Sequence, residues 1–490
     1  MFQNYNHLGF NNPYYYNSKG SFVIKQNLSD LLDVYDGPCR IDPVAIIEFM
    51  NKNYLFADRT LIQDIQRTPW GAKPNKLLNK WEYNSAPKHD LLDIPEEEIA
   101  KTLFQKICSE IQTYIGDKKR IGILLSGGMD SRMVAGALDY LIKANNLTGL
   151  EVTGLTWGNE ETRDVVYAKE IAARLNWKWK HYKVAAKDLL SNIKETAIHG
   201  CEYSPIHLHA IPQIRDDNNL DVILAGSYGD SVGRSEYSRK KVRFVKPILQ
   251  NISNIGGIVH QEIFKHSMKY IENDIERYHI QFPEKEQYMQ NELDYQIHYM
   301  RRMLNPCMEL LTEKMKFCQV FTHHDVYGYM WSINPERRND LVYKYMFQEF
   351  ITKLNDIPWA RTGLQYGMEK GTPDSYHNDH HPYVSIITKE IFDEIKTLVL
   401  SNEIKQLGIF DQGAIKTTLK LLKYFPPNNL YYTERIIWLA SLAEMTRIYK
   451  LQGMESAKSD QYKSKMNLFS IAFVYSLEQT KKIVKSVLNK

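Results

Sequence analysis

The chain has 490 residues, of which 43% are hydrophobic and 24% charged, and its formal net charge is +4. This length suggests about two to four domains, and the small net charge gives no support to a nucleic-acid partner. The number of cysteines is odd and no C-x-x-C pair occurs, which indicates a cytoplasmic protein. The N-terminus is polar, and no apolar run approaches roughly 18 residues, so the protein is not expected to act at a membrane.

The N-terminal 95 residues are predicted to form strands and turns followed by a short helix. Residues 13–24, PYYYNSKGSFVI, have the pattern of a hairpin with Gly20 in its turn. Asp42 and Pro43 then open a short apolar helix, because proline suits the first helical position. The next predicted helix spans residues 96–114, with its apolar residues on one face.

A strand, a glycine turn and a helix follow in residues 120–138, RIGILLSGGMDSRMVAGAL. Strand, turn and helix in this order present backbone N–H groups to an anion. Gly127 and Gly128 let the backbone approach a phosphate, and Ser126 and Ser131 can add hydroxyl donors. The turn lacks both the Gly-Lys-Ser/Thr of a Walker A loop and the G-x-G-x-x-G dinucleotide pattern.

An acid inside this turn, Asp130, would repel a phosphate unless a cation lay between them. The turn therefore indicates Mg²⁺, which one or two carboxylates and phosphate oxygens commonly hold. The alternative is an ordinary glycine turn between a strand and a helix.

Alternating strands and helices follow. Strands are expected at residues 151–156, 177–184 and 221–226, and helices at 164–175 and 187–198. Repeated units of this kind predict an α/β fold with a doubly wound parallel sheet, whose ligand lies beyond the carboxyl ends of the strands.

A second glycine turn, LAGSYGDSVG, ends the strand at residues 221–226. Its acid, Asp230, and Asp130 are both expected at strand ends of one sheet, where they could share a Mg²⁺ bound to pyrophosphate. A surface turn with a capping aspartate is the alternative.

The S-G-G-x-D-S turn resembles the PP-loop of the ATP pyrophosphatases, and LLSGGMDSRMVA is most similar to the synthetase domain of asparagine synthetases. The resemblance implies an adenine nucleotide alpha hydrolase-like fold, ATP and Mg²⁺ as cofactors, and cleavage of ATP to an adenylate and pyrophosphate. Gly226 and Asp230 match the first glycine and the metal-binding acid of the family motif S-G-E-G-A-D-E-L-F-G-G. By position, the resemblance places Leu124, Leu155 and Gly226 in the adenosine pocket.

The second turn departs from the family motif. Ser227 stands where the family has a glutamate, and Ser231 follows the metal acid where the family has a second acid. A serine does not act as a general base near neutral pH without activation. Tyr228 lies one position from a tyrosine of the related β-lactam synthetases. The resemblance thus implies catalytic roles at Ser227 and Tyr228, with the adenylating half retained and the amine-transfer half altered.

Residues 13–83 resemble the closing third of the glutaminase domain of asparagine synthetases, but Phe2 stands in place of the nucleophilic cysteine. We therefore expect residues 1–95 to be a remnant of a glutaminase-like domain. Ammonia, another amine or a glutaminase partner subunit would supply the nucleophile.

The remaining chain, from residue 236, is predicted to be mostly helical. Asp325 matches the final acid of the family motif R-x-P-F-L-D. The family uses a lysine nearby to stabilise the reacting phosphate, and the resemblance leaves two candidates, Arg361 first and Lys344 second.

Two further patterns favour structural roles. His377, His380 and His381 fit a polar loop better than a metal site, since their spacing matches no established ligand set. Residues 468–477, with the lysines that follow, are predicted to form a terminal helix docked on the core; a membrane-surface helix is the alternative.

The sequence thus predicts an asparagine-synthetase-like region at residues 96–490, divided into an α/β core at 96–235 and a helical part at 236–490. The predicted function is an ATP-dependent amide-forming ligase that activates a small-molecule or peptide carboxylate, aspartate by default, for an amine donor. The alternatives are an amide synthase or cyclase acting on a peptide or metabolite, and a non-catalytic nucleotide-binding subunit of a split amidotransferase.

Overall fold

The structure is a computed structural model. It describes residues 8, 12–18, 20–75, 77–145, 147–217, 219–237, 239–254, 257–368, 370–377, 381–427 and 430–454. The predicted helix at 468–477, Phe2 and His380 lie outside the described residues.

The elements fall into three stretches of the chain. The N-terminal stretch contains β1 (Tyr14–Ser18), β2 (Ser21–Lys25), α1 (Leu28–Leu32), α2 (Pro43–Lys52), β3 (Gln66–Arg67), β4 (Ala72–Asn75) and β5 (Lys80–Tyr83). The middle stretch contains α3 (Glu96–Ile115), β6 (Arg120–Leu124), α4 (Met129–Ala144), β7 (Glu151–Trp157), α5 (Arg163–Arg174), β8 (Lys178–Tyr182), α6 (Ala186–Ile198), α7 (Ile211–Arg215), β9 (Val222–Ala225) and the π-helical turn η2 (Gly229–Gly233). The last stretch contains β10 (Glu236–Tyr237), β11 (Lys240–Lys241), α8 (Gln261–Gln281), α9 (Gln287–Asp294), the π-helix η5 (Tyr295–Leu304), α10 (Asn305–Glu309), β12 (Lys316–Gln319), α11 (His324–Ser332), α12 (Asp340–Glu349), α13 (Tyr383–Ser385), α14 (Phe392–Val399), α15 (Asn402–Lys405), α16 (Gln412–Tyr424) and α17 (Tyr431–Tyr449).

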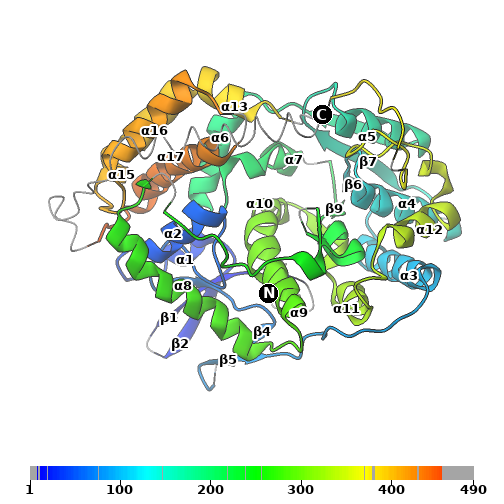
Figure 1. Cartoon of the computed structure of the whole chain (residues 1–490), viewed down its shortest axis with the longest axis horizontal. Helices are drawn as coiled ribbons and strands as arrows, with labels where there is room; N and C mark the ends of the chain where they lie inside the picture. The colour runs from blue at the N-terminus through cyan, green and yellow to red at the C-terminus, as the bar shows by residue number, and fades with distance from the viewer. Residues whose placement is uncertain are drawn as a thin grey trace.

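A five-stranded parallel sheet in the order β12-β9-β6-β7-β8 forms the centre of the α/β part (Figure 1). Leu124 at the end of β6 is in register with Leu155 on one side and Ala225 on the other. The three strands that precede the predicted ligand loops therefore end at one edge of the sheet.

Both faces of this sheet are buried. Ile121 and Ile123 pack on one face with α3, α4 and α5, whereas Ile223 and Ala225 pack on the other with α7 and α10. Helices on both faces of a parallel sheet confirm the predicted doubly wound α/β fold.

The fifth strand was not predicted. β12 pairs with β9 at the edge of the sheet, in a segment expected to be helical. Its four residues, KFCQ, are too few to show a strand period between long helix-patterned segments.

The N-terminal hairpin and helix are confirmed. β1 pairs with β2, and Gly20 takes a φ of 82° in the turn between them. Asp42 caps α2 by accepting a hydrogen bond of 2.9 Å from the Val44 backbone N–H, with Pro43 at the first helical position.

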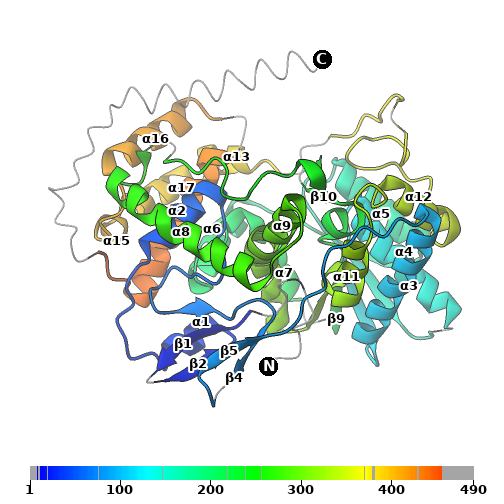
Figure 2. The same ribbon diagram turned by 60° about the horizontal axis from the view of Figure 1, so that its bottom comes forward.

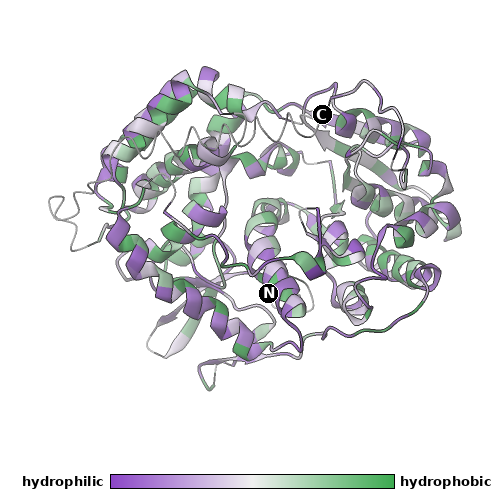
Figure 3. Cartoon of the chain, viewed as in Figure 1, coloured by the Kyte–Doolittle hydropathy of each residue, from purple (hydrophilic) through white to green (hydrophobic). Residues whose placement is uncertain are grey.

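These N-terminal elements share a hydrophobic core with helices from the far end of the chain. Phe49 of α2 stacks on Trp438 of α17 with their ring centroids 4.0 Å apart. Figure 2 shows the strands β1 and β2 below these helices. Figure 3 shows hydrophilic and hydrophobic residues mixed along the helices. None of the described helices is long and apolar enough to cross a membrane.

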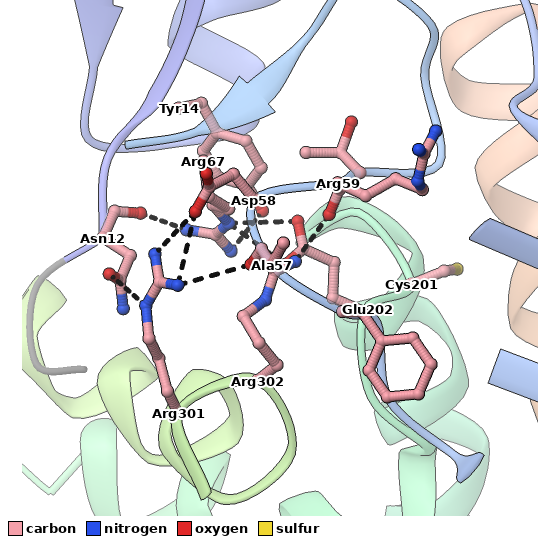
Figure 4. Close-up of polar contacts among 12 residues, drawn as sticks. Asn12, Tyr14, Ala57, Asp58, Arg59, Arg67, Cys201, Glu202, Arg301 and Arg302 are labelled. Carbon is pink, nitrogen blue, oxygen red and sulfur yellow. Dashed lines mark hydrogen bonds and ion pairs between the residues drawn. The ribbon is translucent and has the colours of Figure 1, made fainter. Parts of the chain in front are cut away.

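A buried network of charged side chains joins the N-terminal stretch to η5 (Figure 4). Glu202 accepts hydrogen bonds from Arg67 at 3.0 Å and from Arg302 at 2.8 Å. Next to it, Arg301 lies 3.3 Å from the carboxylate of Asp58. Ion pairs this deeply buried hold neighbouring segments in one arrangement, because separating them would leave uncompensated charges.

Candidate functional site

The first glycine turn is folded around two serine hydroxyls between β6 and α4. The Ser126 hydroxyl oxygen accepts a hydrogen bond of 3.1 Å from the Gly128 N–H. The Ser131 hydroxyl oxygen accepts one of 3.1 Å from the Ser126 N–H, and the two hydroxyls lie 3.0 Å apart. The start of α4 is thereby held at the carboxyl edge of the sheet, where its N-terminal N–H groups favour an anion.

Arg132, on the first turn of α4, anchors this turn to a distant segment. Its buried guanidinium donates hydrogen bonds to the carbonyl oxygens of Ile357 at 2.6 Å, Pro358 at 2.8 Å and Gly127 at 3.1 Å. A Cβ on Gly127 would lie 2.8 Å from that of Ala360, so glycine is required here by close packing. The loop is therefore held in a fixed position by residues far along the chain.

The second glycine turn packs directly on Asp130. A Cβ on Gly226 would lie 2.5 Å from the Asp130 carbonyl oxygen, and one on Gly229 would lie 2.5 Å from the Asp130 Cβ. Tyr343 of α12 donates a hydrogen bond of 2.9 Å to the Gly229 carbonyl oxygen. The two turns thus form one structural unit, and their glycines permit the contact.

We predict that Gly229→Ala weakens the binding of MgATP, because the added methyl group would displace the Asp130 side chain. Overpacking of this kind also costs about 1–3 kcal/mol of stability. Isothermal titration with MgATP measures the first effect and urea unfolding the second. Wild-type affinity in the variant would show that the position of Asp130 does not matter for binding.

Two carboxylates and one arginine dominate the electrostatics of this unit. Burial raises the pKa of Asp130, and the charge of Arg234 opposes that shift. Burial and the charge of Asp130 together raise the pKa of Asp230 to about 7. Arg234 is 1% exposed, and its guanidinium lies 3.8 Å from Asp130.

This arrangement fits a divalent cation. The Oδ1 atom of Asp130 is buried and has no hydrogen-bond partner among the described residues. Both carboxyl groups have raised pKa values, and the charge of Asp130 contributes to the shift at Asp230. A cation would stabilise both as anions, and carboxylate oxygens are the ligands that Mg²⁺ prefers.

Binding of Mg²⁺ together with ATP should therefore depend on pH. Because the pKa of Asp230 is raised to about 7, its carboxyl keeps a proton below that pH and carries a charge above it. We expect Mg²⁺ to bind about tenfold more weakly at pH 6 than at pH 8. Titration of Mg²⁺ in the presence of ATP at both pH values measures this difference in affinity. The variant Asp230→Asn should lose the part of the pH dependence that comes from the protein. The expectation would be contradicted if the wild type and the variant had the same affinities at both pH values.

A cleft of about 430 Å³ opens beside the two turns. Seven of the predicted site residues line it: Leu124, Ser126, Gly128, Asp130, Ser131, Gly226 and Ser227. Residues from β6, α4 and the end of β9 therefore meet at one cleft.

The other predicted site residues lie around this cleft in different surroundings. Gly127 faces Ala360 behind the loop, and Leu155 is fully buried in the hydrophobic core below the cleft. Tyr228 takes a φ of 73°, and its ring is buried in the hydrophobic core that also contains Ile121 and Ile123. Burial raises the pKa of its hydroxyl well above the usual value. Asp230 lies in η2, where its Oδ1 accepts a hydrogen bond of 2.9 Å from the Ser231 N–H.

The two candidate cations also differ in placement. Arg361 donates a hydrogen bond of 2.6 Å to Glu236 and lies over the Trp359 ring, and its charge lowers the pKa of Asp130. Lys344 is exposed on α12. Of the two, Arg361 is the one whose charge is among the main influences on the pKa of Asp130.

Sequence reasoning missed other residues of the cleft: Leu125, Thr156, Trp157, Asp164, Ala225, His209, Met308 and His381. Trp157 could have been found, because it ends the predicted strand β7. No local signal in the sequence marks His209, which follows a short 3-10 turn. Its Nδ1 atom lies 2.6 Å from the Tyr383 hydroxyl oxygen.

A second, larger cavity of about 1050 Å³ borders the cleft. His381 lines both spaces. On one side of the larger cavity lie the segments that follow β7 and β8, and on the other side lies the helical part. Charged and apolar residues line it, among them Glu161, Lys389 and Leu430.

The structure thus holds a phosphate-type glycine turn, with a carboxylate in it, at the carboxyl edge of a doubly wound parallel sheet. Residues 114–304 match the family model of asparagine synthase, which confirms the similarity of this part to the synthetase domain of asparagine synthetases. Among solved structures, the U34-tRNA thiolase NcsA from Methanococcus maripaludis is similar at 12% identity and a TM-score of 0.22, over 44% of this chain and 78% of the thiolase. None of the curated proteins matches the chain.

Proposed function

We propose that the chain is an ATP-dependent ligase that activates a carboxylate as an acyl-adenylate, releases pyrophosphate and passes the acyl group to an amine. The observation that supports this most is the contact between the two glycine turns, which places the Asp130 carboxylate in the cleft beside the Ser126–Ser131 loop. The asparagine synthase match at residues 114–304 supports an ATP-using, amide-forming enzyme in general.

The roles of the site residues follow from their positions. The loop N–H groups and the hydroxyls of Ser126 and Ser131 would hold the phosphates. Asp130 and Asp230 would hold Mg²⁺, which neutralises charge on the departing pyrophosphate. Arg361 is the better placed of the two candidate cations for the reacting phosphate, because it acts on Asp130.

Proton removal from the attacking amine needs a base, and Ser227 offers only a hydroxyl near the Met308 sulfur. His209 lines the same cleft. An imidazole has an ordinary pKa near neutrality, so it is suited to accept this proton. We therefore assign His209 as the base of the amine-transfer step.

The size of the second cavity favours an acid larger than aspartate. Cavities of about 300–1000 Å³ enclose drug-sized molecules, and this one has about 1050 Å³. A peptide or a large metabolite is thus favoured over the default substrate, aspartate. The amine would be ammonia, an amine of the same substrate, or ammonia from a glutaminase partner. The five free cysteines suit a reducing compartment, and we place the reaction in the cytoplasm.

Exchange of pyrophosphate into ATP, measured against a panel of carboxylates from aspartate to peptides, tests this function. Exchange that depends on one acid would support adenylation and identify the substrate class. Tight binding of MgATP without exchange for any acid would instead favour a non-catalytic nucleotide-binding subunit.

A further inference from the structure

A cluster of metal-ligand side chains lies between α3 and α11, outside the nucleotide cleft. The two helices pack against each other (Figure 1). His323 caps the N-terminus of α11, and His324 and Asp325 follow in its first turn. Glu110 faces them from α3, where its side chain is 5% exposed.

Three distances within this cluster lie near the edge length of a metal coordination shell. Nδ1 of His323 lies 3.6 Å from a Glu110 oxygen and 3.7 Å from an Asp325 oxygen, and Nε2 of His324 lies 3.1 Å from the other Asp325 oxygen. Ligand atoms held about 2.0–2.1 Å from a tetrahedral Zn²⁺ are about 3.3–3.4 Å apart. One ligand atom from each of His323, His324 and Asp325 lies within 4.8 Å of the others.

The donor types and the exposure of the cluster also suit a metal. Two imidazoles with carboxylates favour Zn²⁺ and its neighbours in the first transition row over Mg²⁺. Glu110 closes the cluster on the protein side, while the Asp325 side chain is 59% exposed. The His323 and His324 side chains are 22% and 39% exposed, so solvent reaches all three residues at the start of α11.

We infer that one transition-metal ion of the Zn²⁺ class binds at the start of α11 through three side chains, His323, His324 and Asp325, with Glu110 of α3 beside His323. Binding replaces the hydrogen bond of 3.4 Å that Nδ1 of His323 accepts from the Asp325 N–H. This site is separate from the Asp130–Asp230 pair and needs no nucleotide. The ion braces the first turn of α11, and α11 packs both against α3 and against η2, which carries Asp230. The site therefore stabilises the support of the second glycine turn.

Titration of the untagged full chain with Co²⁺ or Zn²⁺ alone tests the inference, with visible absorption of Co²⁺ and thermal unfolding as readouts. We expect one ion per chain outside the carboxylate pair, the absorption of tetrahedral Co²⁺, and a higher Tm with metal. His323→Ala should weaken binding by more than the roughly 10–100-fold that loss of an outer-shell group costs. Asp325→Asn, an exposed change that leaves the fold intact, should remove the Tm shift.

Two controls make the result specific. His266→Ala removes an exposed histidine of α8 and should leave Co²⁺ binding unchanged. Asp230→Asn should also retain the tetrahedral Co²⁺ signal, because it alters the carboxylate pair in the cleft. A folded wild type that binds no Co²⁺, or binding that survives both His323→Ala and Asp325→Asn, would overturn the inference.

Discussion

Replacing Asp130 by asparagine is expected to lower the rate of pyrophosphate–ATP exchange by about 10³-fold, because a metal-assisted step loses several kcal/mol of stabilisation without its carboxylate. Asparagine has nearly the same shape, so the close contacts of Gly226 and Gly229 with residue 130 remain possible. The variant should therefore fold, and the loss should reflect charge alone.

The matched control is Asp139→Asn on the same helix, α4. Asp139 forms an ion pair with the half-exposed Lys143 and is absent from the cleft lining. Its exchange rate should stay within about twofold of the wild type, since surface pairs of this kind contribute about 0–1 kcal/mol. Exchange in Asp130→Asn equal to that in Asp139→Asn would remove the metal role assigned to Asp130.

The sequence was sufficient to predict the part of the site that is formed locally. A buried strand, two glycines and a helix are neighbours in the chain, so residues 121–138 alone predict the loop. The second turn was predicted for the same reason: β9 and Gly226 are adjacent, and parallel strands end at one edge. The pairing of Leu124 with Leu155 and Ala225 confirms that edge.

The sequence alone could not predict the features that depend on contacts between distant segments of the chain. Arg132 lies in a plain helical pattern, and only the fold brings the carbonyl groups of Ile357 and Pro358 to it. The direction of the Tyr228 ring depends on its positive φ, which a sequence pattern does not reveal for a tyrosine. β12 joins the sheet because the helical stretch before it returns the chain to β9, and its four residues carry no period of their own.

The other large effect expected is on stability, from Glu202→Gln. Glu202 is fully buried and pairs with both Arg67 and Arg302, at 3.0 Å and 2.8 Å. Burial already lowers the pKa of Arg302, so removal of the Glu202 charge leaves this guanidinium with less compensation. Breaking a buried pair by neutralising one partner costs about 3–5 kcal/mol. Urea unfolding of the variant should show a midpoint lowered accordingly.

Glu170→Gln on α5 is the matched control for this change. Glu170 accepts a hydrogen bond of 2.6 Å from Arg174 one helical turn away, but its side chain is 39% exposed. Exposed pairs with this spacing contribute about 0.3–0.5 kcal/mol, so the same substitution should hardly move the unfolding midpoint. A small effect at Glu202, comparable to that at Glu170, would mean that water or Asp58 compensates the two arginines. The N-terminal stretch would then be held to η5 by apolar packing rather than by the buried charges.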